Sequence, residues 1–264
     1  MYKVLILISV IALTHFTENS FKNLCGIDSC KCRRHIDCDN YNEILSKKCV
    51  GGTFRVNMTS MKEPILNKHN SFRNVVASGH LSGFSSAARM GTVVWNDHLA
   101  KLASKTIIRC KFEGDECRNT EKFNFVGQSM GRYNYPKISY HPKSMMLNII
   151  DIWISEHENC KMSYINSYPT ATIDNRIIRH FTQIVRDAMT EMGCAAIMYV
   201  KDERRYFEFV CNYSQTNLRS LPVYETGKPI SGCKTGRNSK YPHLCSTEEE
   251  YVVNPPDAKI ANKI

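Results

Sequence analysis

The segment "IIRHFTQIVRDAMTEMGC" (177–194) decides the fold, because it passes from a helical pattern into a β-rich one. Phe181, Val185 and Ala188 recur at helical spacing, which predicts a short helix with His180 near its start. An imidazole at a helix edge can be a metal ligand, a general base or only a surface side chain. The choice depends on which other side chains the chain brings to His180.

The chain after Gly193 has the pattern of a β-hairpin. The β-rich runs "CAAIMYV" (194–200) and "RYFEFVCNY" (205–213) are joined by "KDER". The hairpin centre falls between residues 202 and 203, so Cys194 and Cys211 are equidistant from it. Residues that face each other in an antiparallel pair have Cα atoms roughly 4.5–5.5 Å apart, which a disulfide can bridge. The hairpin geometry therefore predicts a Cys194–Cys211 disulfide.

Helices and short strands alternate upstream of this segment. The expected elements are helices over 61–79, 97–110 and 142–160 and strands over 91–95 and 122–130. Pro64 suits the first turn of its helix, Gly79 suits its end, and Asp97 is the expected N-cap of the next one. This alternation predicts an α/β layered domain.

Glu156 lies within the apolar stripe of the helix expected over 142–160, together with Ile149 and Trp153. Its carboxylate should therefore point inward. A buried carboxylate needs a partner or a raised pKa. A structural salt bridge and a functional acid both remain open for Glu156.

The start of the chain has the pattern of a secretory signal. An apolar run from Val4 to Leu13 follows Lys3. About ten apolar residues suit such a signal, whereas a transmembrane helix needs roughly 18. We therefore expect residues 1–19 to be a signal peptide and the protein to be secreted and extracellular, without a transmembrane segment.

Twelve cysteines follow the expected signal. An even number of cysteines in a secreted chain predicts up to six disulfides. Zinc fingers are the competing interpretation, but the cysteine spacing contains no clean pair of C-x-x-C knuckles.

The formal net charge is +10, and the basic residues are scattered rather than gathered in a run. Such a surface is either simply solvated or weakly attractive to acidic glycans and lipid headgroups. The chain has no recognisable nucleic-acid-binding motif, so nucleic acid is not an expected partner.

Six blocks of the sequence together resemble the CAP superfamily, the group of cysteine-rich secretory proteins, antigen 5 and pathogenesis-related proteins. The blocks are "LNKHNSFRNVVASG", "MGTVVWNDHLAKLA", "CRNTEKFNFVGQSM", "IWISEHENC", "RHFTQIVRDAMTEMGCA" and "FVCNYSQTN". The "CGIDSCKC" start and the "GCKTGRNSKYPHLCS" ending are similar to insect antigen 5-like proteins, also called venom allergen 5-like. The resemblance implies a three-layer α-β-α sandwich over 61–218, with a Cys-rich N-terminal extension over 20–60 and a C-terminal extension over 219–264.

The resemblance also implies a central cleft, which in many CAP proteins holds two histidines and two carboxylates and in some binds a divalent metal. Carried over by position, the set here is His180, Glu156, Gln128 and Gly114, so one histidine and one carboxylate are missing. Arg186 stands where the family pattern has Trp. Stable metal sites use three or four protein ligands. We therefore expect a cleft without a metal or other cofactor, in which His180 and Glu156 lie within roughly 6 Å, one water-bridged contact.

The resemblance pairs three sets of cysteines in the N-terminal half: Cys25–Cys38, Cys30–Cys117 and Cys49–Cys110. Cys233 and Cys245 are the only two cysteines of the tail and are expected to pair with each other. Cys32 and Cys160 then remain and are paired by elimination.

The expected function is that of a secreted, non-enzymatic, monomeric protein that binds an unidentified extracellular ligand or partner, a lipid, glycan or protein, in insect secretions or reproductive fluid. The alternative is a hydrolase that uses the cleft, either with a metal or with Ser155 or Thr182 near His180. Lipid or sterol carriage is a further binding role that the resemblance permits. Asn57 and Asn212 begin the two N-glycosylation sequons, and Asn57, in the loop-rich extension, is the better candidate.

Overall fold

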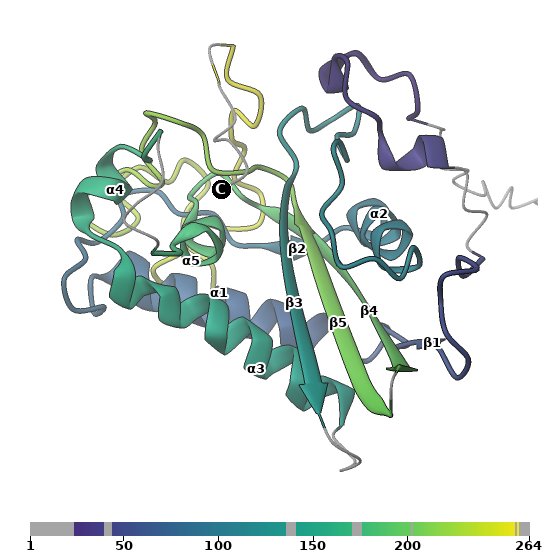
Figure 1. Cartoon of the computed structure of the whole chain (residues 1–264). Helices are drawn as coiled ribbons and strands as arrows, with labels where there is room; N and C mark the ends of the chain where they lie inside the picture. Colours follow the sequence, from purple (N-terminus) through teal and green to yellow (C-terminus); the bar gives the residue numbers. More distant parts are fainter. Residues whose placement is uncertain are drawn as a thin grey trace, which may run out of the picture.

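A five-stranded sheet forms the middle layer of the domain in this computed structural model, which describes residues 24–39, 44–135, 141–170, 176–201, 203–256 and 258 (Figure 1). The strands are β1 (Phe54–Arg55), β2 (Val94–Trp95), β3 (Gly127–Tyr135), β4 (Glu191–Lys201) and β5 (Arg204–Tyr213). Their order is β1-β4-β5-β3, and β2 pairs with β4 in parallel. The expected signal peptide, residues 1–19, lies outside the described residues.

Helices cover both faces of this sheet. The helices are α1 (Lys62–Ser78), α2 (Asp97–Ile107), α3 (Pro142–Ser155), α4 (Met162–Asn166) and α5 (Arg179–Val185), with short 3-10 turns η1 (Asp28–Cys30), η2 (Ile36–Asp39) and η3 (Glu156–Asn159). One face of β4 and β5 packs against α2, through Ala103 and Ile107 of the helix and Ile197 and Val210 of the strands. The other face packs against α1, α3 and α5. The predicted three-layer α-β-α sandwich is therefore confirmed.

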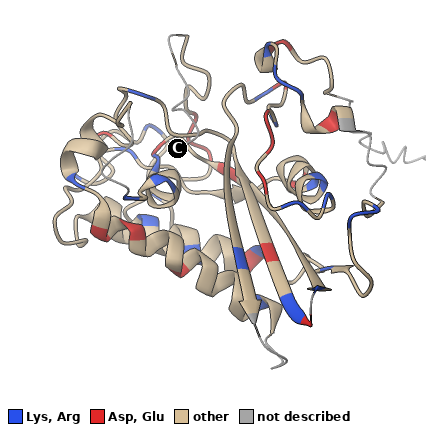
Figure 2. Cartoon of the chain, in the orientation of Figure 1, with Lys and Arg blue, Asp and Glu red and all other residues tan. Residues whose placement is uncertain are grey.

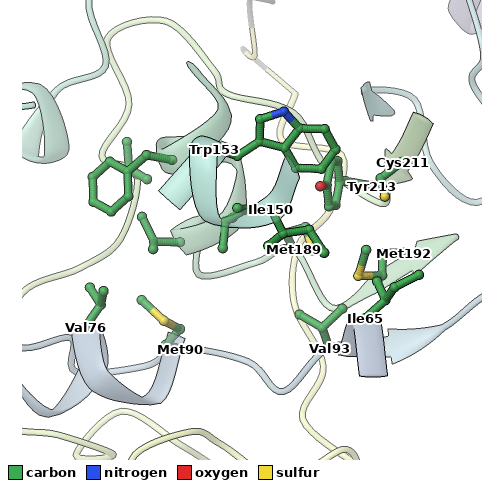
Figure 3. Close-up of a cluster of buried hydrophobic side chains, with 14 of the residues drawn as sticks. Ile65, Val76, Met90, Val93, Ile150, Trp153, Met189, Met192, Cys211 and Tyr213 are labelled. Atoms are coloured by element: carbon green, nitrogen blue, oxygen red, sulfur yellow. The ribbon is translucent and has the colours of Figure 1, made fainter. Parts of the chain in front are cut away.

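The larger core lies between the sheet and α1, α3 and α5. Figure 3 shows Trp153 and Ile150 of α3 above Ile65 and Val76 of α1, with Tyr213 from β5 beside them. All five are at most 2 % exposed. Burying side chains of this size stabilises the fold by about 1.5–3 kcal/mol each relative to exposing them.

The local signals place the starts of α1 and α3 to within one residue, but other helix ends need correction. Helix α2 ends at Ile107 rather than at residue 110, and α3 ends at Ser155 rather than at residue 160, with Glu156 in the 3-10 turn η3 that follows. Asn96, not Asp97, caps α2, because its side-chain oxygen accepts the N–H of Leu99. Helix α5 ends at Val185 rather than continuing to Ala188, because Arg186 takes an extended conformation (φ −60°, ψ 125°). Helix α1 ends as expected, at Gly79 in the left-handed region with φ 81°.

Gly193 allows α2 to approach β4 closely. A Cβ atom at this position would overlap the backbone nitrogen of Ala100 and the backbone oxygen of Asn96. We expect Gly193→Ala to lower the free energy of unfolding by about 1–3 kcal/mol, because neither backbone atom can rotate away. Urea unfolding measures the change, with Gly51→Ala as the control because a Cβ there meets nothing within 4 Å. If Gly193→Ala and Gly51→Ala had the same free energy of unfolding, α2 would not approach β4 as closely at Gly193 as the structure shows.

Five disulfides cross-link the described part of the chain. They are Cys25–Cys38, Cys30–Cys117, Cys49–Cys110, Cys194–Cys211 and Cys233–Cys245. Cys194 and Cys211 face each other in the β4–β5 ladder, as the hairpin symmetry predicted, with Cα atoms 4.0 Å apart.

The sixth expected pair, Cys32 with Cys160, is a correction, because both cysteines are free. Cys32 is exposed in the N-terminal extension, just after η1. Cys160 follows η3 and packs against the core of the helical layer, where burial raises the pKa of its thiol to about 12. Elimination failed because it assumed that every cysteine has a partner within the chain.

His69 of α1 is a fully buried histidine whose stability effect depends on pH. Burial lowers its pKa to about 4, although a hydrogen bond between Nδ1 and the carbonyl of Ile65 opposes this shift. The folded protein therefore takes up this proton less readily than the unfolded chain. Stability is full above about pH 6.5 and falls between pH 6.5 and 4, by about 3 kcal/mol in total.

We expect urea unfolding at pH 7.5, 6.5, 5.5 and 4.5 to show this loss. His35 and His98 also have pKa values lowered by burial and add to the slope in the same direction. A His69→Gln variant should lose part of the slope. If the free energy of unfolding of His69→Gln depended on pH as steeply as that of the parent protein, protonation of a group other than His69 would cause the loss.

Candidate functional site

A cleft of about 670 Å³ opens between β3, α5 and the loop 112–119. Its lining residues are Arg33, Phe112, Gly114, Glu116, Cys117, Arg118, Asn119, Val126, Gln128, Met130, Tyr168, Arg179, His180, Gln183, Thr216 and Asn217. This volume lies within the range of small-molecule sites, roughly 300–1,000 Å³. Three of the four predicted residues, His180, Gln128 and Gly114, line the cleft, and the fourth, Glu156, contacts His180.

Glu156 holds His180 in a fixed orientation. Its Oε1 lies 2.5 Å from His180 Nδ1, and its Oε2 accepts the backbone N–H of His180 (2.8 Å) and of Phe181 (3.3 Å). The His180 ring also stacks on Trp153, with ring centroids 5.6 Å apart. The carboxylate makes Nδ1 the donating nitrogen, so Nε2 is the ring atom available to a molecule in the cleft. The two side chains thus meet directly, closer than the water-bridged contact expected from the sequence.

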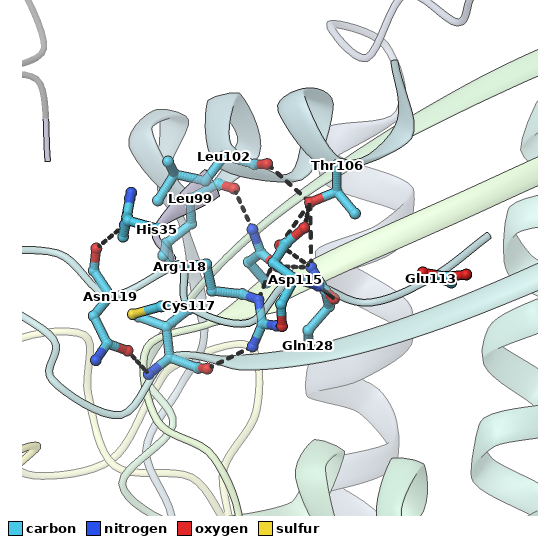
Figure 4. Close-up of polar contacts among 12 residues, drawn as sticks. His35, Leu99, Leu102, Thr106, Glu113, Asp115, Cys117, Arg118, Asn119 and Gln128 are labelled. Carbon is cyan, nitrogen blue, oxygen red and sulfur yellow. Dashed lines mark hydrogen bonds and ion pairs between the residues drawn. The ribbon is translucent and has the colours of Figure 1, made fainter. Parts of the chain in front are cut away.

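Asp115 is the centre of a buried polar network on the other wall of the cleft (Figure 4). Its side chain is 1 % exposed and accepts hydrogen bonds from Arg109 (3.0 Å), Arg118 (3.1 Å), Thr106 (2.7 Å) and Gln128 (2.8 Å). Two cations and two neutral donors thus satisfy one carboxylate. The network fastens the loop 112–119 to α2 and β3.

Gln128 belongs to this network as well as to the cleft. Its Nε2 also donates to Asn212 Oδ1 (3.0 Å), and its Oε1 accepts the backbone N–H of Asp115 (3.3 Å). Gln128 therefore positions the cleft wall, and the network occupies both ends of its amide.

The residues present do not fit a divalent metal. Glu156 already accepts three hydrogen bonds, and Asp115 is neutralised by two arginines. Among the described lining residues, His180 Nε2 and the carboxylate of Glu116, which accepts the backbone N–H of Arg34 (3.0 Å), are then the two candidate ligands. A transition metal needs three or four protein ligands. Cys30, His35 and Cys117 also lie close together, but the two cysteines form a disulfide and both His35 nitrogens are hydrogen-bonded.

The hydroxyls considered as nucleophiles do not contact His180. Ser155 donates to the carbonyl of Ile152, and Thr182 is buried and bonds the carbonyls of Ile178 and Arg179. A serine-type hydrolase needs a nucleophile within hydrogen-bond reach of its base.

The sequence pattern missed three parts of the site. Arg33 reaches the cleft from the N-terminal extension, Asn217 reaches it from the segment after β5, and the Asp115 network links α2 to the loop. Each depends on long-range packing and has no local periodicity. Of these residues, Asp115 alone stands in a short local pattern, two residues before Cys117.

The structure separates the two sequons. Asn57 is exposed and forms a turn in which its Oδ1 accepts the N–H of Thr59. Asn212 is a correction: it is fully buried and donates to the carbonyl of Leu99, so a glycan cannot attach to it in the folded protein. Asn57 remains the predicted glycosylation site.

Comparisons with known proteins agree with this architecture. The family model of the CAP cysteine-rich secretory protein family matches residues 66–213. The chain is 34 % identical to Venom allergen-1 of Aedes aegypti over 245 residues, which cover 93 % of this chain and 95 % of that protein. It is 31 % identical to Venom allergen 3 of Solenopsis invicta over 238 residues, covering 84 % and 99 %.

Solved structures share the fold. NaASP2 with Zn²⁺ matches with a TM-score of 0.57 and 21 % identity, covering 75 % of this chain and all of that chain. BmVAL-1 matches with the same TM-score and identity, covering 75 % and 98 %. The chain therefore belongs to the CAP family, and its relatives include venom allergens and antigen 5-like allergens of insects. None of the helices in the described ranges has the length and apolar character needed to cross a bilayer.

Proposed function

We propose that this protein is a secreted, non-enzymatic CAP protein that binds a small extracellular ligand in its cleft. The observation that carries the proposal is a cleft of small-molecule size whose lining includes an imidazole oriented by Glu156. The Ser155 and Thr182 hydroxyls do not reach this imidazole, and the described lining residues offer too few ligands to form a metal-ligand set. The five disulfides support an oxidising, extracellular setting. Figure 2 shows Lys and Arg distributed over several elements, which supports a local site rather than a broad electrostatic face.

Ligand extraction tests the proposal. The protein would be secreted from cultured insect cells, incubated with haemolymph extract, purified and denatured, and the released small molecules identified by mass spectrometry. Thr216→Trp would fill the cleft, and Ser231→Trp would add the same side chain at an exposed tail position. We expect a compound that the unaltered protein and Ser231→Trp retain and Thr216→Trp loses. Equal recovery from all three proteins would contradict binding in the cleft.

A hydrolase is the second candidate, favoured by one observation. Glu156 orients His180 in the way that an acid orients a general base. Because Ser155 and Thr182 do not reach His180, a hydrolase would have to activate water or use the hydroxyl of Thr216, which lines the same cleft. Turnover of ester or peptide substrates that His180→Ala abolishes would favour this candidate over a binding protein.

The protein is expected not to depend on a metal. Treatment with a chelator should leave the melting temperature unchanged, because the disulfides fasten the fold and the cleft offers too few ligands. Differential scanning calorimetry with and without EDTA measures this. Calorimetric zinc binding at micromolar concentrations that His180→Ala abolishes would contradict the expectation.

A further inference from the structure

Asn217 lines the cleft and carries an unsatisfied hydrogen-bond acceptor, its Oδ1, which is itself buried. The residue is 5 % exposed and lines the cleft, and its Oδ1 has no hydrogen-bond partner among the described residues. Its Nδ2 donates to the carbonyl of Arg179 (3.1 Å), which holds the amide against the start of α5 beside His180. A buried acceptor without a partner is costly, and a ligand that donates a hydrogen bond removes that cost.

His180 adds a second acceptor at the same place. Its Nδ1 faces Glu156, so a neutral ring offers Nε2 as an acceptor. Asn217 bonds the carbonyl of Arg179, the residue before His180, so the two acceptors lie near each other. Together they favour a ligand with a hydroxyl group, which can donate a hydrogen bond to one of them.

The charge of the lining favours an anion. Arg33, Arg118 and Arg179 line the cleft, against a single acidic side chain, Glu116. Asp115 neutralises Arg118, but Arg33 is exposed, and toward the described residues it donates only its Nε, to the carbonyl of Cys30 (3.3 Å). The two terminal nitrogens of Arg33 are therefore available for a carboxylate, which an arginine binds with two parallel hydrogen bonds.

The remaining wall is apolar and partly aromatic. Phe112 and Tyr168 line it together with Val126 and Met130. Aromatic side chains pack favourably against an aromatic ring in stacked or edge-to-face geometry. The cleft thus combines an apolar wall with a few polar groups, which is the usual composition of small-molecule sites.

We propose that the cleft selects a small aromatic acid that carries a hydroxyl group, with its carboxylate at Arg33 and its hydroxyl donating to Asn217. This inference rests on the proposed function, because it names the ligand class of the same cleft. The proposed site excludes amines, because the arginines repel a positive charge. It also disfavours acids that lack a hydrogen-bond donor, because they leave the acceptor of Asn217 unsatisfied.

Isothermal titration calorimetry on the full secreted protein tests the inference with four probes of one shape. They are 4-hydroxyphenylacetate, phenylacetate without the hydroxyl, tyrosol with an alcohol in place of the acid, and tyramine with an amine in its place. We expect 4-hydroxyphenylacetate to bind most tightly and phenylacetate to bind about 5- to 10-fold more weakly, the effect of one lost hydrogen bond. Tyrosol should bind more weakly than phenylacetate, because it loses the two charged hydrogen bonds to Arg33. Tyramine should not bind detectably.

Three variants assign these differences to residues. Arg33→Ala should weaken both acids and leave tyrosol unchanged, whereas Arg34→Ala removes the same charge from the next residue, which does not line the cleft, and should change nothing. Asn217→Leu should make 4-hydroxyphenylacetate and phenylacetate bind equally. If Asn217→Leu does not fold, the comparison of these two acids on the unaltered protein still tests the hydroxyl.

Absence of 4-hydroxyphenylacetate binding, or binding of tyramine or tyrosol at equal strength, would overturn the inference. An Arg34→Ala effect equal to that of Arg33→Ala would overturn it too, because the attraction would then be general. The proposed function is judged separately, by the compound that Thr216→Trp fails to retain. A retained compound that is not a hydroxylated acid would leave that function standing and remove this ligand class.

Discussion

Replacing Asp115 with Ala is expected to lower the free energy of unfolding by about 3–5 kcal/mol, the range measured when one partner of a buried ion pair is removed. The carboxylate is 1 % exposed, and it compensates Arg109 and Arg118, whose side chains are 17 % and 11 % exposed. Without it, two guanidinium groups remain largely buried with no counter-charge, and Thr106 and Gln128 lose an acceptor. Urea unfolding monitored by tryptophan fluorescence measures the loss.

The same loop supplies a matched control. Glu113 pairs with Lys111 at 2.6 Å, but these side chains are 59 % and 53 % exposed. Glu113→Ala should therefore cost about 0–1 kcal/mol, as exposed ion pairs do. Equal losses for Asp115→Ala and Glu113→Ala would show that the Asp115 network does not stabilise the fold through burial.

Removing the Cys30–Cys117 disulfide by a double replacement with Ser is the second large effect. The two cysteines are 87 residues apart in sequence, so the bond restricts a long loop of the unfolded chain. In the chain-entropy model this is worth about 4–5 kcal/mol. Arg33 lies three residues after Cys30, so the replacement should also weaken acid binding in the cleft.

The tail disulfide is the control for loop length. Cys233 and Cys245 are 12 residues apart, and the same model gives about 3 kcal/mol for their removal. Thermal unfolding of both double variants, each compared with the parent protein, measures the two losses. A larger loss from the tail pair would contradict an entropic origin and point to local packing.

The layered fold could be predicted because its signals are local. Helix α1 has a proline in its first turn and a glycine at its end. In the β4–β5 hairpin, two β-rich runs extend the same number of residues from a short turn. Boundaries were less predictable. Asn96 and Asp97 are both good N-caps, and only the hydrogen bond to Leu99 distinguishes them.

The site was predictable only in part. His180 and Glu156 lie on elements with clear periodicity, and the family resemblance placed them together. Arg33 and Asn217 come from segments without periodicity, and their positions depend on how the extension and the chain after β5 fold back. The Cys32–Cys160 pairing failed for the same kind of reason, because counting cysteines carries no information on distance.

The span that the family model matches, residues 66–213, ends before the cleft is complete. Arg33 precedes that span, and Thr216 and Asn217 follow it. The span shared with the family therefore supplies most of the cleft lining, while segments on either side of it supply the rest. Under the proposed function, residues 24–39 contribute Arg33 and residues 214–218 contribute Asn217, and neither segment contains a strand of the sheet. Exchanging both segments between two relatives would therefore test whether ligand preference moves with them while the sheet stays the same.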